Sequence, residues 1–406
     1  MSACRRPAWI VTDAPHGLRS HGFHIGSDRA LDAADLAGCF PRCRRWSVRH
    51  EMLHGGTSEG VELLTVQADD LELQLLPTRG LGIWRGRCGS TRLGWDSPVE
   101  RPVHPAFVNL AERGGLGWLH GFNEWLCRCG LESHGPPCVD GGMTLTLHGR
   151  CANIPAHNVR VEIEPADPQR PDDTGALRVV GTLDEGFLFG PRLRLESTLT
   201  LFPDLNRFRI DDRISNLKST PGEFELLYHI NQGRTLLGPG AALLAPVRRL
   251  APRDARGIPG VPRFHEYEPP TPGYAEQVFY MELHGRGEDR STVVMLRAPD
   301  AAAGLALRFS LQQLPWFVMW KNSIAERDGY VTGLEPAVNL PNTKSFERQQ
   351  GRVRPLPAGG SYSTRIDFEL LGSAGEVAAV AREIAELQAL GPAELRPDPD
   401  PEWSPG

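Results

Sequence analysis

The 406-residue sequence has no long apolar run and no block of one charge. No uninterrupted apolar stretch approaches the ~18 residues of a membrane helix. No apolar segment follows the two arginines near the N-terminus, so a secretory signal is not expected. The 44 basic and 50 acidic residues give a net charge of −6, which disfavours a nucleic-acid partner because such a partner needs a basic face. We therefore expect a cytoplasmic protein that binds neither nucleic acid nor membrane.

Cysteine is scarce as well, with eight residues in the whole chain. Three residues separate Cys39 from Cys43, and one residue separates Cys127 from Cys129, so neither pair has C-x2-C spacing. We expect reduced thiols and no metal site. The sequence contains no Walker motif, and no G-x-G-x-x-G opens a helix after a strand. These absences disfavour the common nucleotide-binding templates, and we expect no cofactor.

The 44 glycines and 35 prolines are spread along the chain and separate many short segments. Several of these segments alternate apolar and polar residues with period two, as half-buried strands do. Tyr362–Leu370 has this pattern, and Arg192–Leu201 followed by Arg207–Ile214 reads as a hairpin with a four-residue connection. The sequence predicts a mostly β protein of antiparallel strands.

One helix is expected near the C-terminal end. Ser373 and Glu376 form an S-x-x-E capping box, apolar residues follow at helical spacing, and Gly391-Pro392 ends the pattern. We predict an irregular lead-in with short helical pieces over 1–45, and a single β-domain over 46–392 that includes an amphipathic helix over 374–390. The proline-rich residues 393–406 are expected to form a loose tail.

Three strand-like segments each place a titratable side chain on their polar face. His148 follows Met143–Leu147, His229 shares its face with Asn231, and Glu335 ends a strand just before a proline. Gly333 lies on the same face as Glu335 and leaves space beside it. Each residue alone is as often a solvated surface group. Together, two imidazoles and one carboxylate indicate general acid and base chemistry near neutral pH.

Other residues are consistent with a sugar-binding groove. Trp316 and Trp320 lie on one side of a predicted strand, and indole rings stack on the apolar faces of sugars, although tryptophans are as often core residues. Further candidates for contacts with hydroxyl groups are a turn arginine, a histidine in a segment rich in aromatic residues, and a glutamate at a strand start: Arg79, His120 and Glu276.

Five short motifs occur in one order between about residues 60 and 370: Pro77–Gly80, Leu147–Arg150, Tyr228–Asn231, Glu276–Phe279 and Leu334–Pro336. In this order they resemble motifs of the aldose 1-epimerase (galactose mutarotase-like) superfamily, and most closely those of its uncharacterised bacterial members. Thr146, in place of the usual glycine, precedes the second motif.

The resemblance implies a β-supersandwich with an open sugar groove. It implies that His148 binds substrate, that a protonated His229 is the general acid, and that an ionised Glu335 is the general base. Glu276 stands where mutarotases carry an aspartate. Lys321 stands where they carry a small or polar residue, which would favour an acidic or phosphorylated sugar.

We therefore predict an isomerase that interconverts the α and β anomers of an aldose or aldose derivative. It would act on a small-molecule sugar as a monomer or homodimer. Two alternatives stay open: a sugar-binding protein without catalytic activity, and an isomerase or lyase that acts on a modified sugar in the same groove.

Overall fold

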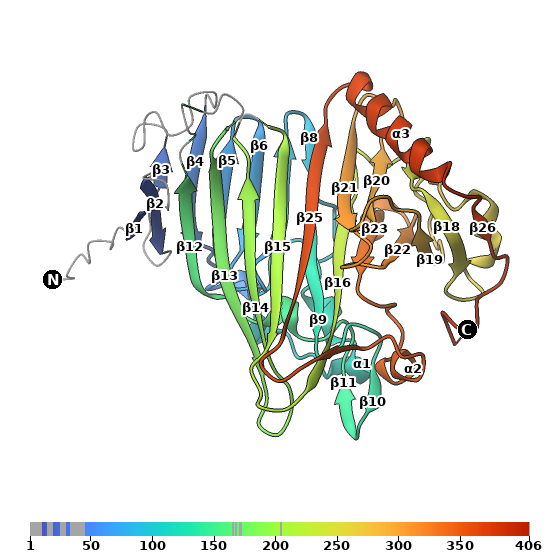
Figure 1. The fold of residues 1–406 in the computed structure, drawn as a ribbon, viewed down its shortest axis with the longest axis horizontal. Coiled ribbons are helices and arrows are strands. Elements are labelled where there is room, and N and C mark those ends of the chain that lie inside the picture. Colours follow the sequence, from blue (N-terminus) through green and yellow to red (C-terminus); the bar gives the residue numbers. More distant parts are fainter. Residues whose placement is uncertain are drawn as a thin grey trace.

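The computed structural model describes residues 45–405 except 165, 167–168, 170–172 and 204, together with the backbone of residues 10–13, 19–24 and 30–32. Two large antiparallel sheets pack face to face, with few helices around them (Figure 1). The prediction of a mostly β protein of antiparallel strands is confirmed.

The first sheet has ten strands, and the predicted hairpin and C-terminal strand lie at its centre. In spatial order its strands are β1 (Ile10–Asp13), β2 (Arg19–His24), β12 (His157–Glu164), β13 (Ala176–Gly186), β14 (Arg192–Leu201), β15 (Arg207–Asn216), β25 (Ser361–Leu371), β21 (Gly304–Ser310), β20 (Ser291–Arg297) and β17 (Ala242–Leu244).

The second sheet has fourteen strands and carries the site described below. Its main path is β26 (Glu394–Leu395), β18 (Val247–Pro252), β19 (Gln277–Leu283), β22 (Trp316–Asn322), β23 (Val331–Ala337), β16 (Gly222–Gln232), β9 (Leu126–Leu131), β7 (Gly82–Cys88), β6 (Leu71–Leu76), β5 (Glu62–Ala68), β4 (Trp46–Met52) and β3 (Ala30–Asp32). Off this path, β24 (Arg354–Leu356) pairs with β16, and β8 (Thr91–Leu93) pairs with β7. A separate small hairpin joins β10 (Cys138–Asp140) and β11 (Met143–Leu145).

The helical elements are short apart from one. They are α1 (Glu112–Gly115), α2 (Lys344–Gln349) and α3 (Ala374–Gln388), with 3₁₀ turns η1 (Gly56–Ser58), η2 (Pro105–Phe107), η3 (Gly117–His120), η4 (Cys151–Asn153), η5 (Ile258–Arg263) and η6 (Glu326–Asp328). Helix α3 confirms the predicted C-terminal helix: the Ser373 hydroxyl accepts from the Glu376 N–H, and its apolar stripe packs on the outside of β20 and β21. No helix among the described residues is long and apolar enough to cross a bilayer.

The main core lies between the two sheets, where alternate residues of each strand meet. At its centre Phe208 of β15 stacks on Phe368 of β25, with ring centroids 4.5 Å apart. A buried ion pair also crosses the interface: Arg128 of β9 binds Asp212 of β15 at 2.5 and 3.0 Å, and the Tyr228 hydroxyl donates to the same carboxylate. These contacts hold the second sheet in a defined position over the first.

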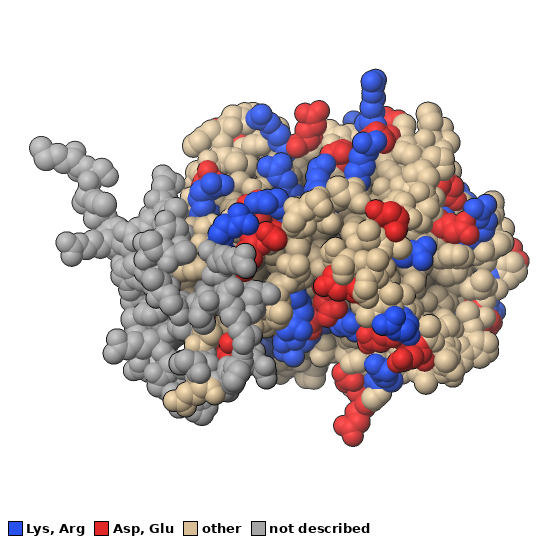
Figure 2. All heavy atoms as spheres, turned by 90° about the horizontal axis from the view of Figure 1, so that it is seen from above, with Lys and Arg blue, Asp and Glu red and all other residues tan. Residues whose placement is uncertain are grey.

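The outer surface carries acidic and basic side chains side by side, with both signs mixed over the visible face (Figure 2). Many of them form exposed ion pairs between neighbouring strands, such as Arg194 with Asp184 at 2.7 Å. Such pairs add little stability individually, but they give a polar surface without a large field of one sign.

The N-terminal lead-in differs from its prediction wherever it is described. Residues 10–13, 19–24 and 30–32 are strands rather than helical pieces; the rest of 1–44, including Cys39 and Cys43, lies outside the described residues. Strand β2 pairs with β12, and β3 pairs with β4. Weak local periodicity did not reveal these strands because pairing with the open edges of two existing sheets stabilises them.

The prediction of a loose tail over 393–406 is wrong for the described residues up to 405. Strand β26 pairs parallel with β18, and Asp400 forms a buried ion pair with Arg249. Trp403 is 3% exposed and meets Trp316 edge to face at 5.1 Å. The prolines exclude a helix or long strand, yet a tail without regular structure still packs when it carries a large apolar side chain.

Replacement of Trp403 by alanine tests this packing. We expect Trp403→Ala to lower the free energy of unfolding by about 3 kcal/mol, because truncation of a buried tryptophan leaves a cavity. Urea unfolding would measure the change. Phe189→Ala is the matched control, since the Phe189 side chain is 98% exposed and its loss should change stability by less than about 0.5 kcal/mol. Equal stability of the two variants would contradict a packed tail.

Candidate functional site

A pocket of about 640 Å³ lies on the face of the fourteen-stranded sheet that points away from the ten-stranded sheet. Successive residues of a strand point to opposite faces, so Tyr228 of β16 enters the core and His229 enters the pocket. By the same rule β22 contributes Trp320 and β23 contributes Glu335. The volume falls in the range of small-ligand sites, roughly 300–1,000 Å³.

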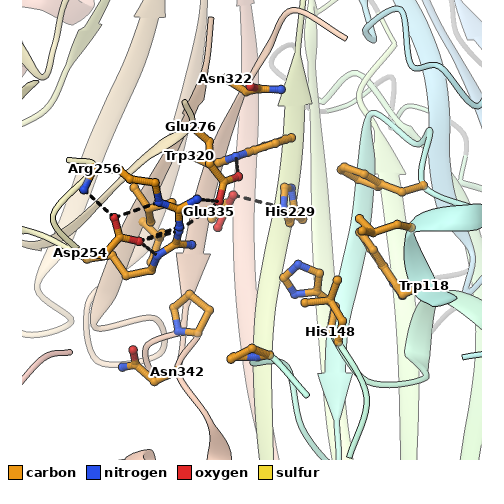
Figure 3. Close-up of a pocket in the computed structure, with 18 of the residues that line it drawn as sticks. Trp118, His148, His229, Asp254, Arg256, Glu276, Trp320, Asn322, Glu335 and Asn342 are labelled. Atoms are coloured by element: carbon orange, nitrogen blue, oxygen red, sulfur yellow. Dashed lines mark hydrogen bonds and ion pairs between the residues drawn. The ribbon is translucent and has the colours of Figure 1, made fainter. Parts of the chain in front are cut away.

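His229 and Glu335 are neighbours across two adjacent strands. The register pairs Leu227 with Ala337 and Ile230 with Leu334, which sets His229 opposite Glu335. Nε2 of His229 lies 3.3 Å from Oε1 of Glu335 (Figure 3). Residues 106 positions apart in the chain thus meet in one pocket, as the acid and base assignment requires.

Gly333 provides the space for the Glu335 carboxyl group. A Cβ atom at position 333 would lie 2.2 Å from Oε1 of Glu335 and 3.1 Å from Cβ of Trp320. The carboxyl group therefore folds back over the glycine, and any larger residue would displace it. This confirms the predicted space beside Glu335.

Burial decides the charges of this pair. It lowers the pKa of His229 to about 3, with a smaller contribution from the nearby His148. It raises the pKa of Glu335 well above its usual range, and the neighbouring Glu276 adds to that effect while Arg253 opposes it. Without a bound sugar, burial therefore favours a neutral imidazole facing a protonated carboxyl group over the ion pair expected from sequence.

His148 also reaches the pocket, but from a turn rather than a strand. Strand β11 ends at Leu145, and His148 has a φ of 56°. The next residue, Gly149, is required by the turn, since a Cβ there would lie 2.1 Å from the Ser133 carbonyl oxygen. Nδ1 of His148 lies 2.9 Å from the His134 carbonyl oxygen, and burial lowers the His148 pKa to about 4. The imidazole is therefore neutral, and its Nε2 is a hydrogen-bond acceptor.

Aromatic rings line one side of the pocket (Figure 3). Trp118 of η3 packs against Phe122 at 4.4 Å and against the His148 ring at 4.6 Å. The Phe122 and Trp320 rings lie 5.1 and 5.4 Å from the His229 ring. Such a surface suits the apolar face of a pyranose. Of the two predicted tryptophans, Trp320 is in the pocket, whereas Trp316 packs on Trp403 outside it.

A charged wall faces these aromatic rings (Figure 3). Glu276 accepts from the Trp320 indole at 2.8 Å and from Arg253 at 3.0 Å, and Arg256 lies 3.3 Å away. Asp254 binds both arginines at 2.8 Å. The two cations are thus neutralised by two carboxylates, and Glu276 is held in place by two hydrogen bonds and one further ion pair.

Four predicted site residues do not reach the pocket as substrate contacts. Arg79 is fully buried and binds Glu124 at 2.6 Å behind the pocket wall. Lys321 points to the opposite face of β22 from Trp320 and pairs with Glu268 at 2.9 Å. His120 pairs with Glu112 at 3.4 Å outside the pocket, and Asn231 is buried behind His229.

The aromatic segment around His120 was expected to line one rim of the groove, and its Trp118 and Phe122 do line the pocket. Sequence reasoning missed other lining residues, among them Arg253, Asp254, Arg256, Asn342, Ser404 and Pro405. The R-D-A-R run directly after a strand was a usable signal for the charged wall. No local signal places the last two, because Ser404 and Pro405 reach the pocket only through the packing of the tail, where the Ser404 hydroxyl donates to the Arg253 carbonyl oxygen.

Within the described part of the chain, no group of three or more His, Cys, Asp or Glu side chains could hold a metal ion. The described cysteines are all free thiols: Cys88, Cys127, Cys129, Cys138 and Cys151. The pocket can position a polyol by stacking and hydrogen bonds, and it can exchange a proton at one buried pair.

Comparison with known proteins gives a consistent result. Residues 58–370 match the family model described as domain of unknown function (DUF4432). A crystal structure from Klebsiella pneumoniae, of a protein provisionally named an aldose 1-epimerase, is 32% identical with a TM-score of 0.88, and the alignment covers 94% of this chain and 99% of that one.

A galactose mutarotase-like protein from Clostridium acetobutylicum shares the fold at 13% identity, with a TM-score of 0.51 over 80% of this chain and 98% of that one. No protein of curated function matches the sequence. The chain therefore belongs to the DUF4432 family, within the galactose mutarotase-like (aldose 1-epimerase) superfamily.

Proposed function

We propose that the protein binds a free aldose in this pocket and interconverts its α and β anomers. The observation that carries the proposal is the 3.3 Å contact between Nε2 of His229 and Oε1 of Glu335, in a pocket of sugar size with an aromatic wall. Anomer exchange needs one group that accepts a proton and another that donates one. This pair holds a single exchangeable proton, which meets both needs.

In the proposed mechanism, the proton of the pair passes from Glu335 to Nε2 of His229 when the sugar binds. Glu335 then takes the proton from the anomeric hydroxyl, and His229 donates its Nε2 proton to the ring oxygen. The ring opens, the aldehyde group rotates about its bond to the next carbon, and closure reverses the two transfers. His148 accepts a hydrogen bond from a sugar hydroxyl, and Glu276 accepts others. The aromatic wall holds the ring while these transfers occur, which lowers the entropic part of the barrier.

We further propose that the substrate is neutral. The expectation of an acidic or phosphorylated sugar rested on Lys321, which lies outside the pocket and pairs with Glu268. Arg253 and Arg256 do line the pocket, but Asp254 and Glu276 already bind both of them. An anionic sugar would have to break these pairs or add a charge beside Glu276. The expected substrates are therefore aldoses without a carboxylate or phosphate group.

A panel of aldoses, sugar acids and sugar phosphates tests the reaction. We expect proton NMR to show faster exchange between the anomers of at least one neutral aldose, with no new species formed. Calorimetry on the same panel separates catalysis from binding. Sugar binding without faster exchange would favour a binding protein, and new products would favour an isomerase or lyase.

Glu335→Gln should reduce anomer exchange by roughly 10²–10⁴-fold, because an amide cannot accept and return the proton. Sugar binding should stay largely intact, since the amide keeps the size of the carboxyl group. Polarimetry measures the rate and calorimetry the affinity. Glu196→Gln, which changes an exposed residue of β14, is the control and should match the wild type. A fully active Glu335→Gln variant would overturn the assignment.

Gly333→Ala should also reduce the rate constant kcat by roughly 10²-fold or more, because the added Cβ displaces the Glu335 carboxyl group from its position opposite His229. Gly186→Ala is the matched control in another strand, since a Cβ there meets nothing within 4 Å. Circular dichroism would check that both variants keep the fold. Unchanged kcat in Gly333→Ala would show that the position of the carboxyl group does not limit the reaction.

A further inference from the structure

The amide group of Asn231 is held in one orientation. Its Nδ2 donates to the Glu124 carbonyl oxygen at 3.0 Å and to the His229 carbonyl oxygen at 3.3 Å. Both partners are acceptors only, so the NH₂ end of the amide must face them. Oδ1 is left to face the imidazole of His229, 2.6 Å from Nδ1. Asn231 is fully buried, so water cannot replace these partners.

This orientation determines the tautomer of neutral His229. An amide oxygen only accepts, so Nδ1 of His229 must carry the proton and donate it to Oδ1. In the neutral ring Nε2 then has no proton, and Oε1 of Glu335 lies 3.3 Å away without a hydrogen bond in its present orientation. A carboxylate at this distance would repel the Nε2 lone pair, whereas a protonated carboxyl group can turn its O–H toward it.

The other titratable and charged groups around His229 do not favour an imidazolium ion. His148 is a second imidazole, with ring centroids 5.5 Å apart, and burial raises the pKa of the Cys127 thiol on the adjacent strand β9. Of the carboxylates, Glu124 is paired with Arg79, and Glu276 is paired with Arg253 and Arg256. Among the residues that the structure describes, Glu335 is the only one whose carboxyl group contacts the ring directly.

We propose that Asn231 is a positioning residue: it holds His229 as the Nδ1–H tautomer, so that the single proton of the His229–Glu335 pair rests on Glu335 until a sugar binds. The inference concerns the pair to which the proposed function assigns catalysis. Sugar hydroxyls that donate to Glu335 stabilise its carboxylate form. The O–H bond of Glu335 then breaks and an N–H bond forms at Nε2 of His229. This transfer leaves a carboxylate base and an imidazolium acid, the charges that anomer exchange requires.

Nitrogen-15 and carbon-13 NMR of the full-length wild-type protein tests where the proton lies. Without sugar at pH 7, the His229 ring should be neutral with a protonated Nδ1, and the Glu335 carboxyl carbon should have the shift of the acid form. The His229→Gln and Glu335→Gln variants assign the two signals. An imidazolium ring, or a ring protonated at Nε2 only, would overturn the proposal. The NMR measurement does not depend on catalytic activity. A lack of mutarotase activity would therefore defeat the proposed function, while the position of the proton would still be decided by the spectra.

Asn231→Ala removes the acceptor for Nδ1–H without adding charge. The ring should then populate the Nε2–H tautomer as well, and kcat should fall roughly tenfold or more with little change in KM, since Asn231 does not line the pocket. A purely structural role would lower stability and leave the tautomer and the pH profile unchanged. If His229 stays protonated only at Nδ1 in Asn231→Ala, the positioning role is wrong.

Discussion

The two-residue alternation of β16 is the constraint on which the site depends. Tyr228 points into the core and donates to Asp212, which binds Arg128. His229, one residue further, necessarily points the other way, into the pocket. The buried contacts of Tyr228 therefore hold the strand in register, and this register sets His229 opposite Glu335 on β23. A shift by one residue would bury the imidazole in the core and send the phenol to the pocket.

The site holds polar groups where water is largely excluded, which costs desolvation free energy. Neutral protonation states and nearby ion pairs offset this cost. Burial favours the neutral forms of His229 and Glu335, so the pair avoids the desolvation of two charges. The charges that do remain nearby are matched: Arg79 with Glu124 behind the wall, and Arg253 and Arg256 with Asp254 and Glu276. The proton of the central pair thus lies between two groups that burial keeps close to neutral.

Part of the pocket wall is formed by segments without regular structure. The turn at His148 and Gly149 brings an imidazole over Trp118, and the C-terminal tail brings Ser404 beside Arg253. The turn is held by the contact of the His148 ring with the His134 carbonyl oxygen, and the tail is held by the pairing of β26 with β18 and by the buried ring of Trp403. The sheet supplies His229 and Glu335, the proposed acid and base, whereas irregular segments supply much of the wall that shapes the pocket.

The sequence by itself determined the strands and the residues that each strand presents on its polar face. Period-two alternation is local, so β14, β15, β25 and β23 and the face of Glu335 could be predicted from neighbouring residues alone, as could the cap of helix α3. The chemical candidates His148, His229, Glu276, Trp320 and Glu335 were likewise visible as polar or aromatic groups at strand ends and on polar faces, and all five line the pocket.

Only the tertiary structure decided which of the candidates meet, what charge they carry and what surrounds them. Arg79 and Lys321 have the chemistry of a binding site, but both are buried and form ion pairs away from it, because a side chain's partner depends on segments distant in sequence. The neutral state of His229 and Glu335 follows from burial, which no local pattern encodes. The tail packs on the fold through the buried side chain of Trp403. The amide of Asn231 is oriented by carbonyl groups that only the folded sheet places beside it.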